Sequence, residues 1–260
     1  TNITAYDYGK SAHGKTDIQT ALRQSYNTAA IRALVEVGPT RAKQFITNLG
    51  IQTTQALAGS TAISMNISSE ELAGAIGAFG QSGVYHPTRY VKSLRFSDNS
   101  VKQISFKPVQ AMRASTAYVM TKMLEGVFSQ KGTAPDAAIN GVAMAGKTGT
   151  NGYPDDSIYA GDTMDLWTIG YTKSISMALW YGFDTPMRPG NQLNEYVGDS
   201  NKDKLYKDIM TYMNKNRDVS EWTKPNTVRQ LGSGSGLNAN YQATDQPLKT
   251  VTKTLNKVSM

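Results

Sequence analysis

The chain has 260 residues, 27 Lys and Arg against 20 Asp and Glu, and a formal net charge of +7. This length suits one large domain with a substantial core. The sequence has no cysteine and two isolated histidines, His13 and His86, which excludes thiol chemistry and disfavours a metal centre or a Ser-His-Asp triad. We therefore predict no metal and no cofactor. No apolar run approaches the roughly 20 residues that span a bilayer.

The basic residues are scattered singly along the chain, without runs or interleaved aromatic residues. This pattern gives no support for nucleic-acid binding, and it suits an anionic envelope or an acidic substrate equally well. The chain opens Thr1-Asn-Ile-Thr without an initiator methionine or a basic leader, so we expect it to be a piece of a longer protein.

The first 80 residues predict short helices. Asp17 precedes one helical pattern, a second ends at Gly38-Pro39, and a third spans residues 40–49. Ser68 and Glu71 form a capping-box pattern, which predicts that a further helix begins there.

The rest of the chain predicts strands and two helices. The expected strands are residues 84–96, 101–106, 165–171 and 175–181, paired as two hairpins, and the expected helices are 115–128 and 202–214. Helices first, then adjacent antiparallel strands and a closing helix indicate an α+β arrangement. Residues 231–260 begin with Gly-Ser repeats and stay polar, so we expect a mobile linker or tail.

Residues 141–150 allow three interpretations. Gly141 to Thr148 match the phosphate-loop pattern GxxxxGK[ST], but Gly149 to Pro154 hold two glycines and a proline where a helix would have to begin. The alternative is an edge strand that lines a cleft, with Thr148 and Thr150 on one face and Lys147 on the other. The lysine and hydroxyls could then hold a carboxylate while the Thr150 amide polarises a carbonyl. A plain surface turn is the third alternative.

Ser25-Tyr26-Asn27 lies at the junction of two predicted helices. On a turn, the side chains of Ser25 and Asn27 can point the same way, although both residue types are also common helix caps. A serine hydroxyl between two lysines can relay a proton to a leaving amine, and an asparagine amide can hold a substrate amide. Such a site needs neither histidine nor metal.

These two motifs, in this order, resemble two of the three signatures of the penicillin-recognising serine transpeptidases: SxN at Ser25-Tyr26-Asn27 and KTG at Lys147-Thr148-Gly149. The stretches that resemble class A (bifunctional) penicillin-binding proteins in particular are residues 21–29, 71–85, 145–150 and 165–172. The resemblance covers residues 1–230, and it implies the C-terminal part of a transpeptidase domain: an α+β fold with an antiparallel sheet and helices on both faces.

One departure from the family pattern is large. The third signature, Ser-x-x-Lys, carries the family's nucleophile upstream of SxN, and it occurs nowhere in these 260 residues. Thr40-Arg-Ala-Lys43 has the right spacing but lies downstream of SxN. We therefore expect an incomplete domain here, with the nucleophilic serine on a separate polypeptide.

The resemblance implies a catalytic group of four residues. Ser25 would relay a proton to the departing D-Ala amine, and Lys147 would support that relay. Asn27 would bind the amide of the acyl donor. The backbone amide of Thr150 would be one donor of the oxyanion hole.

The same resemblance implies a substrate-binding set: Tyr26, Thr148, Gly149 and Thr150, with the two threonines on the terminal carboxylate. The implied partners are peptidoglycan stem peptides and β-lactams, at the extracytoplasmic face of a bacterial membrane. A serine β-lactamase or D,D-carboxypeptidase of the same fold is the alternative enzyme. A non-catalytic wall-binding module is the alternative without chemistry.

Overall fold

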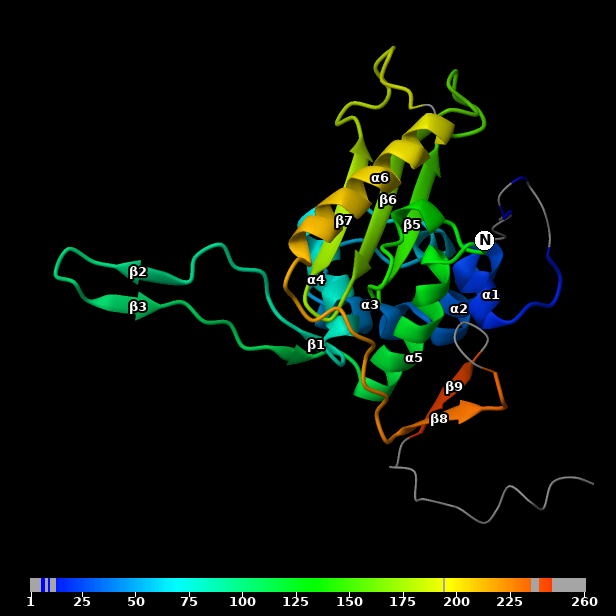
Figure 1. The fold of residues 1–260 in the computed structure, drawn as a ribbon. Helices are drawn as coiled ribbons and strands as arrows, with labels where there is room; N and C mark the ends of the chain where they lie inside the picture. The colour runs from blue at the N-terminus through cyan, green and yellow to red at the C-terminus, as the bar shows by residue number, and fades with distance from the viewer. Residues whose placement is uncertain (1–5, 8, 10–12, 194, 235–238, 245–260) are drawn as a thin grey trace, which may run out of the picture.

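A three-stranded antiparallel sheet forms the centre of the computed structural model, which describes residues 6–7, 9, 13–193, 195–234 and 239–244 (Figure 1). Its strands, in the order β5-β6-β7, are Ala145–Gly152, Thr163–Tyr171 and Ser176–Gly182. Helices α4 (Ser69–Gly80) and α5 (Ala114–Leu124) pack on one face, and α6 (Glu195–Met213) packs on the other. The predicted α+β fold is confirmed.

The remaining elements surround this centre. The other helices are α1 (Ile18–Arg23), α2 (Asn27–Val37), α3 (Pro39–Asn48) and the 3₁₀ turns η2 (Gly59–Ala62), η3 (Glu125–Phe128) and η4 (Pro135–Ala137). Among the described residues there are also three small antiparallel pairs: β1 (Val84–Tyr85) with β4 (Val109–Gln110), β2 (Ser93–Arg95) with β3 (Val101–Gln103), and β8 (Val228–Leu231) with β9 (Asn240–Ala243).

Local signals in the sequence set several of these boundaries. The amide of Glu71 donates to Ser68 Oγ at 3.1 Å and the Glu71 carboxylate accepts from the Ser68 amide at 3.1 Å, which is the predicted capping box. The hydrogen bonds that the Glu71 carboxylate accepts from the Ser68 amide and hydroxyl hold its pKa below its usual value. Asp17 caps α1 by accepting from the Thr20 amide at 2.8 Å. Gly38, with φ of 83°, turns the chain between α2 and α3.

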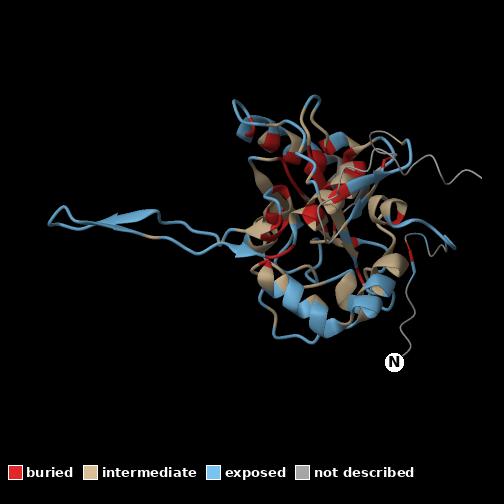
Figure 2. Ribbon diagram, turned by 90° about the horizontal axis from the view of Figure 1, so that it is seen from below, coloured by how far each residue is buried: buried red, intermediate tan, exposed pale blue. Residues whose placement is uncertain are grey.

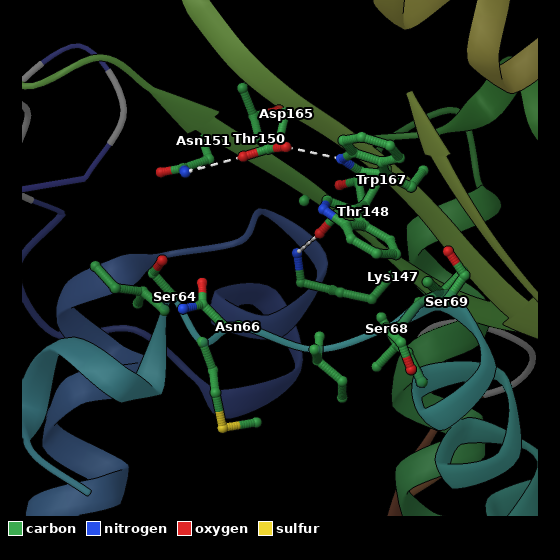
Figure 3. A pocket seen from close by; sticks show the side chains of 17 residues that line it. Ser64, Asn66, Ser68, Ser69, Lys147, Thr148, Thr150, Asn151, Asp165 and Trp167 are labelled. Carbon is green, nitrogen blue, oxygen red and sulfur yellow. Dashed lines mark hydrogen bonds between the residues drawn. The ribbon is translucent and has the colours of Figure 1, made fainter. Parts of the chain in front are cut away.

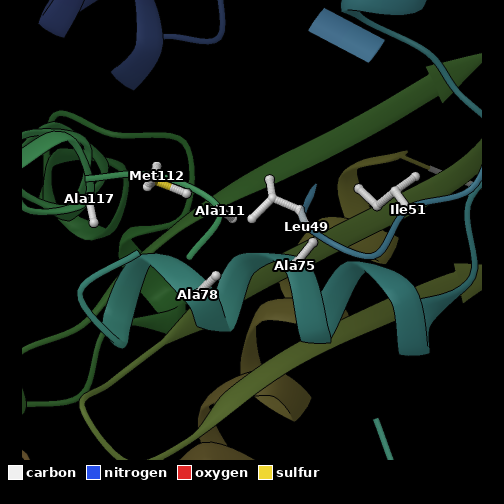
Figure 4. Close-up of a cluster of buried hydrophobic side chains, with 7 residues drawn as sticks. All are labelled: Leu49, Ile51, Ala75, Ala78, Ala111, Met112 and Ala117. Carbon is white, nitrogen blue, oxygen red and sulfur yellow. The ribbon is translucent and has the colours of Figure 1, made fainter. Parts of the chain in front are cut away.

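Helix α4 joins the N-terminal helices to the sheet. On one side its alanines lie in a buried cluster: Leu49, Ile51, Ala75, Ala78, Ala111, Met112 and Ala117 (Figure 4). On the other side, Ile76 packs with Leu124 of α5 and with Ala145 and Tyr171 of the sheet. Small side chains allow such close approach, so α4 fixes β5 relative to the segments that precede it.

A pair of glycines brings the opposite face of the sheet close to its cover. Gly146 of β5 lies directly opposite Gly170 of β6. A Cβ on Gly146 would lie 2.8 Å from the Phe128 ring, and one on Gly170 would lie 2.5 Å from the Tyr206 hydroxyl. Phe128 and Tyr206 stack with centroids 6.0 Å apart. The missing side chains thus make room for this aromatic pair.

Two structural predictions for the residues after position 80 are corrected. Residues 84–96 do not form one strand, because they divide into β1 and β2 around Pro87, which cannot donate to a ladder. The predicted tail is ordered in part, because β9 pairs with β8 and the Tyr241 ring packs edge-on against Tyr118 at 5.6 Å. Residues 235–238 and 245–260 of that predicted tail lie outside the described residues.

Two predicted helix limits also shift. Helix α6 begins at Glu195, ahead of the predicted residue 202, and the predicted helix over residues 115–128 tightens into a 3₁₀ turn from Glu125. The two central hairpin strands and the edge-strand interpretation of residues 145–150 are confirmed. No helix follows Lys147 and Thr148, so the phosphate-loop interpretation is excluded.

We expect Gly170→Ala to lower the free energy of unfolding by about 1–3 kcal/mol, because the added methyl group overpacks the contact with Tyr206. Denaturant unfolding measures the change. Gly152→Ala is the matched control on the same sheet, since its Cβ would meet nothing closer than 3.6 Å. Equal losses in the two variants would contradict the packing argument.

Candidate active site

The two predicted motifs meet in space. Lys147 Nζ donates to Ser25 Oγ at 2.6 Å, across 122 positions of sequence, and also donates to the Thr148 carbonyl at 3.0 Å. Ser25 comes from the turn between α1 and α2, and Lys147 comes from the edge strand β5. The structure therefore brings the SxN serine and the KTG lysine into direct contact.

A strained turn presents Ser25. Its φ is 59°, in the left-handed region that few residues other than glycine adopt. The Ser25 amide donates to the Leu22 carbonyl at 3.2 Å, and the Tyr26 amide donates to the Ala21 carbonyl at 2.9 Å. These bonds close the end of α1 and hold the strained residue in place.

The other two residues of the SxN motif face the N-terminal segment. Asn27 begins α2, and its Nδ2 donates to the Tyr6 carbonyl at 3.1 Å. The Tyr26 ring stacks on the ring of His13, with centroids 3.8 Å apart and an interplanar angle of 5°. Asn27 therefore lies beside Ser25 in the chain, while its amide is engaged by backbone outside the motif.

Sequence analysis missed Asp7, which anchors this turn. Asp7 is buried, and its carboxylate accepts from the Thr28 amide and the Thr28 hydroxyl, both at 2.9 Å. Tyr26, the N-cap residue of α2, makes no side-chain capping bond, so Asp7 supplies the acceptor that the helix start needs. No local sequence pattern could reveal this, because Asp7 and Thr28 are 21 positions apart.

Burial lowers the pKa of Lys147 to about 8, because removal from water disfavours the charged ammonium. Its hydrogen-bond acceptors, Ser25 Oγ and the Thr148 carbonyl, are neutral. A cation whose hydrogen-bond acceptors are neutral keeps its electrostatic attraction for a negatively charged ligand. The same group can exchange its proton near neutral pH.

The KTGT residues occupy an accessible strand edge. Within the part of the chain that the structure describes, β5 pairs only with β6, so alternate amides on its other side make no ladder bonds there. Thr150 is exposed there, and the Thr148 hydroxyl lies 2.7 Å from the hydroxyl of Thr133, which sequence analysis missed. Gly149 lies opposite Trp167, and a Cβ on it would lie 3.3 Å from the Trp167 Cβ.

A cleft of about 490 Å³ opens beside this strand (Figure 3). The residues that line it are Ile63–Ser69, Leu72, Lys147–Asn151, Asp165, Trp167, Ile169 and Trp180. Asp165 accepts from Trp180 Nε1 at 2.7 Å and from Asn151 Nδ2 at 3.2 Å, which fixes one end of the cleft. Among the described residues, no three His, Cys, Asp or Glu side chains gather as a metal site.

The opposite wall carries a second Ser-x-Asn sequence, Ser64-Met65-Asn66, across the cleft from the strand (Figure 3). The motif is so short that the sequence alone does not show which of the two copies belongs to the site. The contact of Lys147 selects Ser25, because its hydrogen bonds go to Ser25 and the Thr148 carbonyl.

Comparison with known proteins places the chain in a family. The sequence model for the penicillin binding protein transpeptidase domain matches residues 1–211. The chain therefore belongs to the penicillin-binding transpeptidase family, which confirms the resemblance drawn from the SxN and KTG motifs.

Its relatives include penicillin-binding proteins 1A of two streptococci. It is 36% identical to that of Streptococcus oralis over 240 residues, which is 86% of this chain and 36% of the relative. It is 34% identical to that of Streptococcus pneumoniae over 249 residues, which is 89% of this chain and 34% of the relative. The chain thus spans about a third of the length of these relatives.

Solved structures support the same fold. The PonA1 protein of Mycobacterium tuberculosis in complex with penicillin V superposes with a TM-score of 0.72 at 20% identity, over 94% of this chain and 65% of that one. Penicillin-Binding Protein 1A of Haemophilus influenzae gives 0.71 at 15% identity, over 95% and 43%. No helix in the described ranges is long and apolar enough to span a bilayer.

We expect Asp7→Ala to lower the free energy of unfolding by about 1–2 kcal/mol, because it removes the cap of α2. Denaturant unfolding measures the loss. Asp98→Ala is the control: Asp98 is exposed and accepts within its own turn, from the Ser100 amide at 2.9 Å and the Ser100 hydroxyl at 2.6 Å. An Asp7 variant as stable as this control would show that the cap contributes nothing.

Proposed function

We propose that this chain carries the proton-relay and substrate-binding half of a peptidoglycan D,D-transpeptidase. The observation that carries the proposal is the 2.6 Å contact between Lys147 Nζ and Ser25 Oγ beside an open strand edge. The substrate is the D-Ala-D-Ala end of a stem peptide. β-Lactams bind the same site because they mimic the acyl donor.

The binding step uses the strand. The terminal carboxylate of the donor lies against the hydroxyls of Thr148 and Thr150 within the field of Lys147. The exposed position of Thr150 and the partners of Lys147 support this arrangement. Gly149 leaves the strand open between these residues, and Tyr26 and Asn27 border the donor's amide. Asn27 must exchange its bond to the Tyr6 carbonyl for one to the substrate.

The acylation step is a proton relay. A serine hydroxyl attacks the penultimate D-Ala carbonyl and loses its proton to the lysine of its own Ser-x-x-Lys segment. The carbon–nitrogen bond breaks, and Ser25 passes a proton to the departing amine. Lys147, with its pKa lowered to about 8, donates a hydrogen bond to Ser25 and can replace that proton. The Thr150 amide stabilises the oxyanion, and loss of one such donor typically costs about 2.7–4 kcal/mol of transition-state stabilisation. An amine of a neighbouring stem peptide then takes the acyl group.

The attacking serine is supplied from outside these 260 residues, by a segment with the Ser-x-x-Lys signature that the sequence lacks. We propose that this segment is a separate polypeptide, and that the parent protein works at the extracytoplasmic face of the membrane. A denaturing mass spectrum of the purified sample after labelled penicillin tests the proposal. The label is expected on a second, shorter chain. A sample that contains no second chain and takes up no label would refute activity in this form.

The completed domain is this chain together with the Ser-x-x-Lys segment. In it, we expect Lys147→Ala to reduce the rate of acylation by penicillin about tenfold or more, because the relay loses its cation. Stopped-flow or mass-spectrometric acylation kinetics measure the rate. Lys204→Ala is the control, since Lys204 is exposed on α6, which covers the other face of the sheet.

The pH profile tests the same residue. Lys147 is charged below its pKa of about 8 and loses its charge as the pH rises through that value, so acylation should decline above pH 8. The arginine of Lys147→Arg keeps its charge at high pH. The decline in acylation above pH 8 should therefore disappear in this variant, even if its acylation rate is lower than that of the unsubstituted domain. An acylation rate that rises through pH 8 in the unsubstituted domain would contradict a role for the cation.

A further inference from the structure

A long hairpin arm, residues 87–108, projects from the body beyond α4 (Figure 1). Strands β2 and β3 form its ribbon, with Leu94 opposite Lys102. Nearly every residue of the arm is exposed, as its colouring in Figure 2 shows. At its base, Tyr90 is hydrogen-bonded to the Glu70 carboxylate, which ties the arm to α4. An isolated two-stranded ribbon buries little and is marginally stable, so its length calls for an explanation.

The arm concentrates positive charge. It carries five cations, Arg89, Lys92, Arg95, Lys102 and Lys107, against the single carboxylate of Asp98. Within the described ranges, no carboxylate forms an ion pair with any of these five. The cations are scattered in the sequence, but the ribbon gathers them along its length. Lys102 lies opposite Leu94, Arg95 lies on the other face opposite Val101, and Lys92 precedes the paired residues, with its carbonyl accepting from the Ile104 amide. The fold thus makes a linear cationic array from residues that form no run.

Apolar side chains alternate with these cations. Leu94, Phe96 and Val101 are 44%, 49% and 48% exposed, and Phe106 at the base of the arm is 52% exposed. Lysines on a free ribbon can simply discourage edge-to-edge pairing. That explanation does not account for large apolar side chains held in water beside them, because such side chains favour association.

We propose that the arm binds an anionic wall glycopolymer, a linear chain of sugars or polyols joined by phosphodiesters. A linear array of cations matches a linear polyanion better than a compact acidic patch, and binding releases the counterions of the polymer. The Phe96 ring, exposed between cations, can pack against the apolar face of a sugar. This inference uses the proposed function only to place the ligand in the cell wall.

Other occupants fit the arm less well. The turn at its tip is polar, with Asp98 accepting from the Ser100 amide and hydroxyl, so it offers no apolar end to insert into a membrane. A second arm would bring a like charge against the first. A nucleic acid is also a linear polyanion and therefore belongs in the test.

The test compares two charge-reversed variants of the full chain. One is Lys92→Glu/Arg95→Glu/Lys102→Glu on the arm. The other is the control Arg32→Glu/Arg41→Glu/Lys43→Glu on α2 and α3, where all three residues are exposed. Both change the net charge equally. Binding is measured by co-sedimentation with Gram-positive cell walls, before and after hydrofluoric acid removes their phosphodiester-linked polymers, and with a DNA duplex at matched ionic strength.

We expect the unsubstituted chain to bind intact walls about tenfold more tightly than stripped walls, and the arm variant to lose about tenfold in affinity while the control stays within about twofold. Equal losses in both variants, equal binding to stripped walls, or tighter arm-dependent binding to DNA would overturn the proposal. Circular dichroism and thermal unfolding check that both variants fold. Penicillin acylation of the completed domain should be unchanged in the arm variant, which keeps this result separate from the transpeptidase proposal.

Discussion

The contact between the Lys147 ammonium and the Ser25 hydroxyl constrains the rest of the structure. A cation partly removed from water must keep its hydrogen bonds, and its acceptors are the neutral oxygens of Ser25 and Thr148. The turn between α1 and α2 must therefore stay in register with the edge of the sheet. The lowered pKa of Lys147 is the electrostatic consequence of that position, and it suits the group to the proton relay that we propose.

Close packing on both faces of the sheet maintains this register. On one face, the alanines of α4 let the N-terminal helices approach the sheet, and on the other, Gly146 and Gly170 admit the Phe128–Tyr206 stack. Interiors packed this densely transmit small displacements, so the position of Lys147 depends on side chains far from the cleft. Lys147, Thr148 and Thr150 of the proposed site thus lie on a closely packed strand, and that strand lines the cleft.

The sequence predicted what local chemistry decides. The Ser68–Glu71 capping box, the break at Gly38 and the central hairpin depend on residues a few positions apart, and each was confirmed. The SxN and KTG motifs were predictable because their residues and their order resemble those of the penicillin-binding transpeptidases. The contact of Asp7 with Thr28 was not, nor was that of Thr133 with Thr148, because tertiary packing alone brings those residues together.

The two errors about strands have a common physical origin. Residues 84–96 have the side chains of a strand, but Pro87 and the lack of a continuous partner leave only short ladders. Residues 240–243 lack an apolar pattern, yet they form β9 because β8 offers a backbone partner and Tyr118 offers a ring. Strand formation depends on the available partner more than on the composition of the segment, and a partner is not visible in a local window.

In the functions that we propose, the arm and the cleft recognise their ligands through two kinds of force. The arm leaves the body on the side opposite α1, so a polymer held there does not cover the turn that carries Ser25 (Figure 1). The cleft depends on contacts of hydrogen-bond length, and these act only once the substrate has entered. Unpaired cations on an exposed ribbon act over about a Debye length, roughly 8 Å at physiological salt, and they tolerate an irregular ligand. The transpeptidase that we propose needs both kinds of force, because its substrate is part of a solid polymer network and cannot diffuse to it.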